Sequence, residues 1–203
     1  MVTVRVPATT ANLGPGFDTL GLALALYNTL TFEELPEGLF FEGVEPEYAT
    51  EENLAVVSYK AVLTKLGLPM PGLRVTMETG IPICRGLGSS AALIAAGAAG
   101  ANAKLGSPLS GEELLAVCND IEGHPDNLAP AIFGGLVASF VENGRPYIAR
   151  YSLHRSLCCT ALIPDFQLPT NLPQSERPEQ GPYFDPLHKV YRTALRPKAC
   201  DNG

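Results

Sequence analysis

The sequence has few basic residues and few metal-binding ones. Only 14 of its 203 residues are Lys or Arg, against 21 Asp or Glu, which gives a formal net charge of −7. Domains that bind nucleic acid carry a basic patch, and no cluster of Lys and Arg with interleaved aromatics occurs here, so nucleic acid is not an expected partner. The five cysteines form no CxxC pair, and together with only three histidines they argue against a zinc site.

Long hydrophobic runs are also missing. The longest apolar run, Leu20 to Leu26, is far shorter than the roughly 20 residues that a membrane-spanning helix needs. The first residues, MVTVRVPATTANLGPGFD, lack the apolar segment of a secretory signal peptide. An odd number of cysteines without such a signal is typical of reduced thiols in the cytosol. We therefore expect a soluble, cytoplasmic protein with no membrane partner.

Apolar periodicity predicts both strands and helices. Val2, Val4 and Val6 alternate with polar residues and predict a strand that ends at Pro7, followed by a loop over ATTANLGPGFDTLG. Further strands are expected at 20–26, 29–35, 73–83, 133–141, 147–153 and 159–166. Helices are expected at 50–67 with Thr50 as N-cap and Gly67 as the stop, at 89–105 before Gly106, and at 110–123 with Ser110 and Glu113 as a capping box.

The order of these elements predicts an α+β fold with helices on one face of a mostly antiparallel sheet. After Phe166 the pattern changes, because TNLPQSERPEQGPYFDPLHK carries four prolines and little periodicity, which is typical of a loop or linker. We therefore expect a first domain over residues 1–166 and a second, divergent part over residues 167–203.

The segment PICRGLGSSAAL, residues 82–93, is the strongest candidate for a ligand site. A P-loop needs a lysine that reaches the phosphates, and residues 66–103 contain none, so that motif is excluded. The Rossmann fingerprint is nominally matched by Gly86, Gly88 and Ala91. However, the acids about 20 residues further on start an expected helix instead of ending a strand. The Rossmann match is therefore weak.

A third phosphate-binding device is a loop of glycines and serines that leads into a helix N-terminus. Gly86 and Gly88 permit positive φ and bring backbone N–H groups close to anionic oxygens, and Arg85 adds a charge beside them. The helix that begins near Ser89 adds the positive end of its dipole. From this stretch alone, phosphate binding and a ligand-free strand-to-helix turn both stay open.

Three stretches together resemble the GHMP small-molecule kinases, and among them the homoserine kinases. They are VPATTANLGPGFDTLGLAL (6–24), PICRGLGSSA (82–91) and EGHPDNLAPAIFGG (122–135), and the resemblance covers about residues 2–166. It implies a domain like the second domain of ribosomal protein S5, followed by a ferredoxin-like domain of which 167–203 would be only the truncated start. It also implies Mg²⁺-assisted transfer of the ATP γ-phosphate to the hydroxyl of L-homoserine, a step towards threonine.

The resemblance also assigns a substrate site. Asn12 and Asp18 match positions that hold homoserine, and a carboxylate suits the ammonium of an amino acid. In isolation these two residues fit a turn-shaping role equally well. His124 and Asn127 match further substrate contacts in a reaction that relies on positioning more than on a strong base. Asp126 is expected to fix its own loop.

Nucleotide and metal contacts follow from the same resemblance. Ser90 matches a serine on the metal side, and the carboxylate ligand matches Asp120, with Glu122 as the fallback. We expect Asp120 to act in catalysis with His124 and Asn127. Asn53 matches a position near the adenine, and Cys84 stands where the family has a small residue. The expected nucleotide-binding residues are Asn53, Pro82, Ile83, Cys84, Arg85, Gly86, Leu87, Gly88, Ser89, Ser90, Ala91 and Ala92.

The tail departs from the family pattern. The arginine expected to bind the substrate carboxylate falls at Gln174, and the third glycine-rich motif has no counterpart. We therefore expect binding of ATP and Mg²⁺ to survive better than turnover, and a homodimer through the surface that a second domain would cover. The alternatives are a non-catalytic remnant or nucleotide-binding module, a kinase for another small alcohol, and a Rossmann oxidoreductase.

Overall fold

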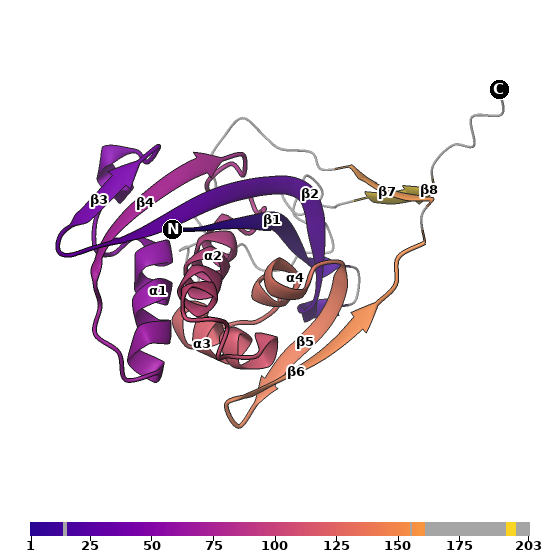
Figure 1. Ribbon diagram of the computed structural model, residues 1–203. Helices are drawn as coiled ribbons and strands as arrows, with labels where there is room; N and C mark the ends of the chain where they lie inside the picture. The colour runs from indigo at the N-terminus through magenta and orange to yellow at the C-terminus, as the bar shows by residue number, and fades with distance from the viewer. Residues whose placement is uncertain (14–15, 155, 161–193, 198–203) are drawn as a thin grey trace, which may run out of the picture.

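A computed structural model describes residues 1–13, 16–154, 156–160 and 194–197. In these residues a six-stranded sheet curves around four α-helices, which lie on one of its faces (Figure 1). This is the predicted α+β arrangement. The second part predicted for residues 167–203 lies outside the described residues apart from 194–197, so the domain division stays a prediction.

The sheet has the strand order β3-β4-β2-β5-β6, and β1 pairs with β2. The pairings are antiparallel except that of β3 with β4, which is parallel. The strands are β1 (Val2–Leu13), β2 (Gly16–Leu35), β3 (Leu39–Glu42), β4 (Gly72–Thr79), β5 (Leu136–Glu142) and β6 (Arg145–Tyr151), with a separate pair of β7 (Leu157–Thr160) and β8 (Ala194–Pro197). The helices are α1 (Leu54–Lys65), α2 (Ser89–Lys104), α3 (Gly111–Glu122) and α4 (Leu128–Phe133), with a 3₁₀ turn at Pro46–Tyr48.

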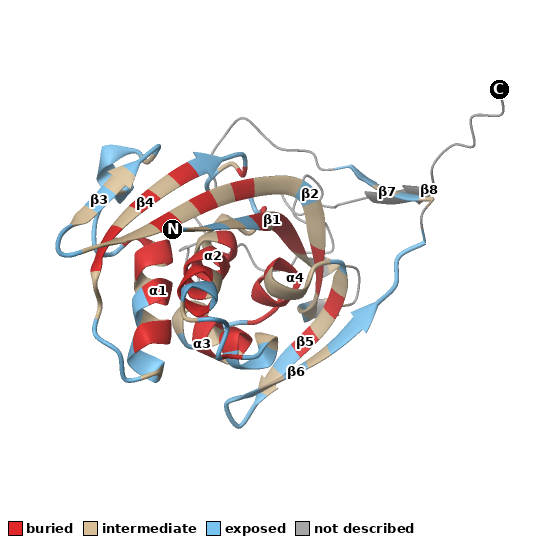
Figure 2. Ribbon diagram, viewed as in Figure 1, coloured by how far each residue is buried: buried red, intermediate tan, exposed pale blue. Residues whose placement is uncertain are grey.

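The core lies between the sheet and the helices, where buried residues face one another (Figure 2). Helix α2 can sit deep in this core because it is built from small residues. A Cβ atom at Gly97 would collide with the Ala55 carbonyl of α1, and one at Gly100 would meet the Phe32 ring of β2 at 2.5 Å. This close packing fixes the direction of α2, and with it the position of the helix N-terminus that follows residues 82–88.

Three helices were predicted correctly from local signals. Ser110 and Glu113 form the reciprocal capping box of α3, and Gly67 and Gly106 adopt positive φ just after α1 and α2. The N-cap of α1 was predicted wrongly, because it is Asn53 and not Thr50 whose side chain accepts from a first-turn N–H group. Among the described helices, none is long and apolar enough to cross a membrane.

The prediction that Pro7 ends the first strand was wrong. Strand β1 continues to Leu13, so much of the expected loop over residues 8–21 is paired strand. Proline lacks an N–H group, but in the described sheet β1 pairs only with β2, and an edge strand tolerates this loss. A register shift between Pro7 and Ala8 marks the irregularity. The extension carries Thr9 and Thr10 into the interior.

Candidate active site

Residues 82–88 form a loop with alternating left-handed backbone. Cys84, Gly86 and Gly88 have φ values of 54°, 67° and 64°, and Gly88 is the N-cap of α2. Such alternation points successive backbone N–H groups towards one concave side, an arrangement that binds anions. A glycine N-cap has no side chain to accept from the first-turn N–H groups, so the helix N-terminus offers donors to the same place. The loop can therefore hold a phosphate group.

The three sequence motifs meet at one point of the fold. The buried Thr9 hydroxyl of β1 donates to Asn127 Oδ1 over 2.9 Å, and the Thr9 N–H donates to the Leu87 carbonyl over 3.0 Å. A Cβ atom on Gly88 would collide with Thr9 Oγ1 and would lie 3.3 Å from Asn127 Oδ1. The first motif, the loop and the third motif, which span more than a hundred residues of sequence, thus form one packed unit.

Helix α3 brings a carboxylate to the loop. Ser90, in the first turn of α2, donates to Glu122 Oε1 over 2.7 Å. Asp120 is exposed and lies two residues earlier on the same helix, and residues two apart on a helix do not face the same side. The structure therefore brings Glu122, the fallback ligand, to Ser90.

A hydroxyl and a carboxylate side by side are suitable oxygen ligands for Mg²⁺. In the described residues, no group of three or more His, Cys, Asp and Glu side chains could hold a metal ion. Mg²⁺ does not need such a group, because it usually keeps several waters and takes only one or two carboxylates in addition to substrate phosphates. The pair of Ser90 and Glu122 fits that requirement.

Asp126 organises the third motif from a buried position. Its side chain is 5% exposed, and Oδ1 accepts from the Asn127 N–H over 2.8 Å and from His124 Nδ1 over 3.0 Å. The hydrogen bond to Asp126 raises the pKa of His124 despite partial burial, and the charges of Asp126, Glu122 and Asp18 act in the same direction. The imidazole thus keeps its positive charge to higher pH, while Asp126 fixes the loop as expected.

The first motif contributes Asp18 to the same surroundings. Asp18 is exposed on β2 with a φ of 52°, and its charge acts on the His124 pKa, so the two side chains belong to one electrostatic neighbourhood. Asn12 lies on β1, and its side chain is outside the described part of the structure.

Asn53 is fully engaged with the backbone. Its Oδ1 accepts from the Ala55 N–H over 3.0 Å, and its Nδ2 donates to the Tyr48 carbonyl over 2.9 Å. The hydrogen bond that the Tyr48 hydroxyl donates to the Glu47 carboxylate raises the pKa of Tyr48, and the negative charges of Glu47 and Glu45 act in the same direction. Asn53 therefore fastens the Tyr48 segment to the start of α1, and its expected place near the adenine stays a prediction.

Sequence reasoning missed two residues that shape this site. Thr9 was assigned to a loop because the strand was ended at Pro7, and no local signal points to its partners. Gly21 of β2 packs against the third motif, where a Cβ atom would collide with the Asp126 carbonyl and lie 2.8 Å from Pro130. Both residues contact the third motif, from which they are distant in sequence.

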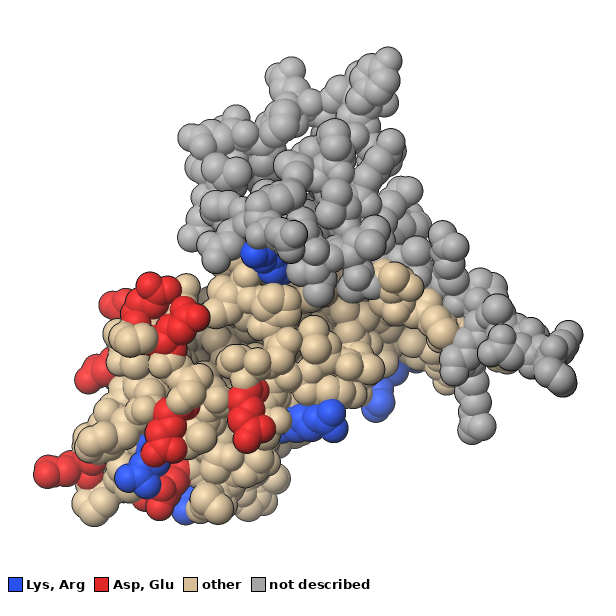
Figure 3. Space-filling view, turned by 90° about the horizontal axis from the view of Figure 1, so that it is seen from above, with Lys and Arg blue, Asp and Glu red and all other residues tan. Residues whose placement is uncertain are grey.

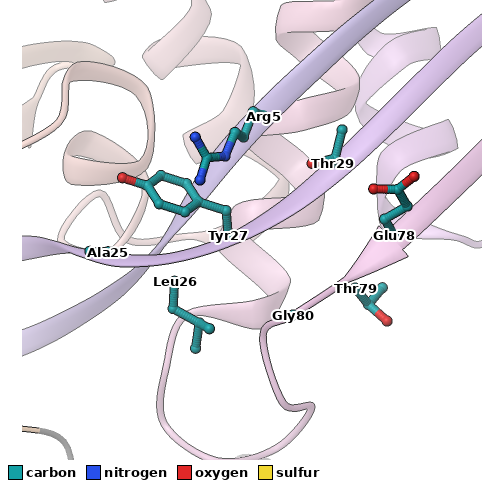
Figure 4. Close-up of a pocket in the computed structure, with 8 residues that line it drawn as sticks. All are labelled: Arg5, Ala25, Leu26, Tyr27, Thr29, Glu78, Thr79 and Gly80. Carbon is teal, nitrogen blue, oxygen red and sulfur yellow. The ribbon is translucent and has the colours of Figure 1, made fainter.

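Two other surface features lie apart from this constellation. A shallow groove on strands β1, β2 and β4 has the Arg5 guanidinium carbon 3.7 Å from the centre of the Tyr27 ring, and Glu78 at its edge (Figure 4). Acidic side chains gather at the end of the molecule that carries β3 (Figure 3). Residues 33–52 there contain eight Glu and neither Lys nor Arg, and three of these glutamates form ion pairs with Arg74 or Lys104.

Comparisons with known proteins place this geometry in a family. The GHMP kinases N terminal domain matches residues 53–135, which include the loop and the third motif. The homoserine kinase of Clostridium botulinum (strain Loch Maree / Type A3) is 44% identical over 203 residues, which are 100% of this chain and 68% of that protein. The homoserine kinase of Clostridium beijerinckii is 40% identical and is likewise covered over 68% of its length.

Similar solved structures indicate the same family. A Listeria monocytogenes protein assigned as a homoserine kinase is 38% identical, with a TM-score of 0.71 over 85% of this chain and 62% of that one. The homoserine kinase of Cytophaga hutchinsonii is 27% identical, with a TM-score of 0.69 over 83% and 57% of the two chains. The mevalonate kinase of Methanococcus jannaschii, at 16% identity and a TM-score of 0.57, shares the fold. The chain therefore spans about two thirds of the length of its curated relatives and less of the solved structures.

Proposed function

We propose, for a chain that belongs to the homoserine kinases of the GHMP kinase family, that its own residues bind Mg·ATP and L-homoserine and carry phosphoryl transfer between them. The observation that carries this proposal is the convergence of the three motifs at Thr9, Gly88 and Asn127. That convergence brings the loop over residues 82–88 into contact with Thr9 and Asn127, which supports an anion site beside an amino-acid site.

The loop over residues 82–88 would hold the nucleotide phosphates. The left-handed backbone at residues 84, 86 and 88 would direct N–H groups towards one concave side of the loop, and the first turn of α2 would supply further donors. Arg85 adds a positive charge beside them. Because these donors are held by the packing of α2, they need little rearrangement when charge develops in the transition state.

Ser90 and Glu122 would hold Mg²⁺ through their side-chain oxygens. When bound there, the ion would neutralise charge on the phosphates during transfer. The direct hydrogen bond between the two side chains, 2.7 Å long, keeps both oxygens at one place beside the loop. We therefore assign the carboxylate role to Glu122 in preference to Asp120.

Homoserine would lie between the first and third motifs. Asp18 suits the substrate ammonium, and Asn127 offers amide hydrogens to a substrate oxygen. His124 would lie beside the reacting groups, and its raised pKa extends the pH range in which its imidazole is charged. Asp126 accepts hydrogen bonds from the Asn127 N–H and from His124, which supports a loop-fixing role over that of a general base. Transfer would then depend on positioning and charge neutralisation.

Calorimetry of the purified chain tests this proposal. We expect Mg·ADP to bind the wild-type protein and L-homoserine to bind in its presence, whereas Ser90→Ala weakens only the metal-dependent nucleotide signal. Ser107→Ala, beyond the far end of α2, is the matched control and leaves both affinities unchanged. A folded wild-type sample that binds neither ligand would contradict the proposal. A cytoplasmic location and a homodimer stay predictions.

A further inference from the structure

We propose that Thr9 of β1 is a positioning residue, which sets the orientation of the Asn127 side-chain amide and couples it to the phosphate loop. This inference rests on the proposed function, because it takes Asn127 to contact homoserine. Thr9 lies inside the first motif, but the resemblance to the family implies no contact for it.

Thr9 connects two parts of the site through two different atoms. Its hydroxyl donates to Asn127 Oδ1 and its backbone N–H donates to the Leu87 carbonyl, at 2.9 and 3.0 Å. Thr9 is 0% exposed, so water cannot reach the Thr9 atoms to replace either bond. Buried polar groups that lose their partner carry a free-energy penalty, and this penalty holds Asn127 and the loop to the same strand.

The two neighbours of the Asn127 amide allow only one orientation. Asp126 Oδ1 lies 3.5 Å from Asn127 Nδ2, and a carboxylate can only accept hydrogen bonds. Flipping the amide would turn its oxygen towards this carboxylate, which is repulsive, so the nitrogen must face Asp126 and the oxygen must face Thr9. The Thr9 hydroxyl is then necessarily the donor.

This orientation decides what Asn127 can offer a substrate. Its oxygen already accepts one hydrogen bond from Thr9, whereas the 3.5 Å approach of Nδ2 to Asp126 is at the outer limit of hydrogen bonding. The amide hydrogens thus remain for an oxygen atom of the ligand. Without the Thr9 hydroxyl, Asn127 would lose the contact that holds its donors in place.

The same contact links the two ligand sites. Gly88 fits between Thr9 and Asn127 only because it has no Cβ atom. Any displacement of the loop on phosphate binding would therefore change its contacts with both side chains. A nucleotide that holds the loop against Thr9 should also hold the Asn127 amide in place, and should therefore raise the affinity for homoserine. Because linkage is reciprocal, homoserine should raise the affinity for the nucleotide by the same factor.

Two substitutions separate the hydroxyl from the shape of the side chain. Thr9→Val removes the hydroxyl and keeps the volume, and Thr9→Ser keeps the hydroxyl. In the wild type and in Thr9→Ser we expect Mg·ADP to raise homoserine affinity at least about fivefold, the low end of typical coupling. In Thr9→Val we expect homoserine affinity to fall about tenfold and the coupling factor to approach one, an effect of the size of a lost hydrogen bond.

A measurement without ligands tests whether the Thr9 hydroxyl orients the Asn127 amide. Thr9→Val should shift or broaden the side-chain amide signals of Asn127 in an NMR spectrum of the free protein, and Thr9→Ser should preserve them. If Thr9→Val does not fold, Thr9→Ala removes the same hydroxyl and leaves no methyl group to accommodate. A purely structural role would lower the melting temperature without changing the coupling factor or these signals.

The outcomes separate the two proposals. Unchanged Asn127 signals, or unchanged homoserine affinity and coupling, in a folded variant without the Thr9 hydroxyl would overturn the positioning role. If the Asn127 signals respond as expected but the wild type binds neither ligand, the orientation of Asn127 by Thr9 is supported and the proposed function is contradicted.

Discussion

Gly88→Ala is the substitution that most directly tests the meeting point of the three motifs. Gly88 has a φ of 64°, and an added Cβ atom would collide with Thr9 Oγ1 and lie 3.3 Å from Asn127 Oδ1. A left-handed backbone costs a residue with a Cβ about 1–2 kcal/mol. Overpacking a well-packed site typically adds about 1–3 kcal/mol. We therefore expect a loss of about 2–5 kcal/mol in the free energy of unfolding, a large share of the roughly 5–15 kcal/mol typical of domains.

Gly106→Ala is the matched control for this experiment. Gly106 has a φ of +80°, but an added Cβ atom there would meet nothing within 4 Å, so only the backbone cost of about 1–2 kcal/mol applies. Urea unfolding followed by circular dichroism gives both values, and calorimetry gives Mg·ADP affinity. We expect Gly88→Ala to be the more destabilising and to lose nucleotide binding, whereas Gly106→Ala keeps it. Equal stabilities, with normal nucleotide affinity in Gly88→Ala, would refute the reasoning.

Three further predictions concern the Mg²⁺ ligand, the pKa of His124 and the N-cap of α1. Glu122→Gln should weaken Mg·ADP binding more than Asp120→Asn does in calorimetry, because Glu122 contacts Ser90; the reverse order would return the ligand role to Asp120. Asp126→Asn should lower the His124 pKa in an NMR titration, since the hydrogen bond to Asp126 is the main cause of the raised pKa. The stability that a raised histidine pKa contributes is fully present below the unfolded pKa of about 6.5 and is lost as pH rises through the folded pKa. Asp126→Asn should therefore make the free energy of unfolding depend less on pH across that window. Asn53→Ala should cost about 0.5–2 kcal/mol in urea unfolding and Thr50→Ala much less, because Asn53 is the N-cap of α1; equal costs would contradict this.

Helices were predictable here because their signals are local. The capping box of Ser110 and Glu113 and the glycines after α1 and α2 lie within a few residues of the helix ends. Helix α4 was missed because it is six residues long and contains Pro130, which weakens a helical pattern. Strand β1 beyond Pro7 was missed for a different reason, since its pairing with β2 is decided by contacts that a local pattern does not record.

The site divides in the same way. The phosphate loop and Glu122 as an alternative ligand follow from recognisable motifs and stay predictions, whereas the hydrogen bonds of Asp126 to Asn127 and His124 agree with its expected role in fixing the loop. It could not show that Ser90 faces Glu122, since that contact depends on how α2 and α3 pack. Nor could it show the bond between Thr9 and Asn127, which lie 118 residues apart. Such contacts exist only after the fold has formed.

The central claim is that the residues of this chain form a kinase site for homoserine. A coupled ADP-release assay with Mg·ATP, run with and without L-homoserine, tests it most directly. We expect ADP release that depends on homoserine and that is lost in Ser90→Ala. A folded chain that binds Mg·ATP but releases ADP at the same rate with and without homoserine would contradict the claim.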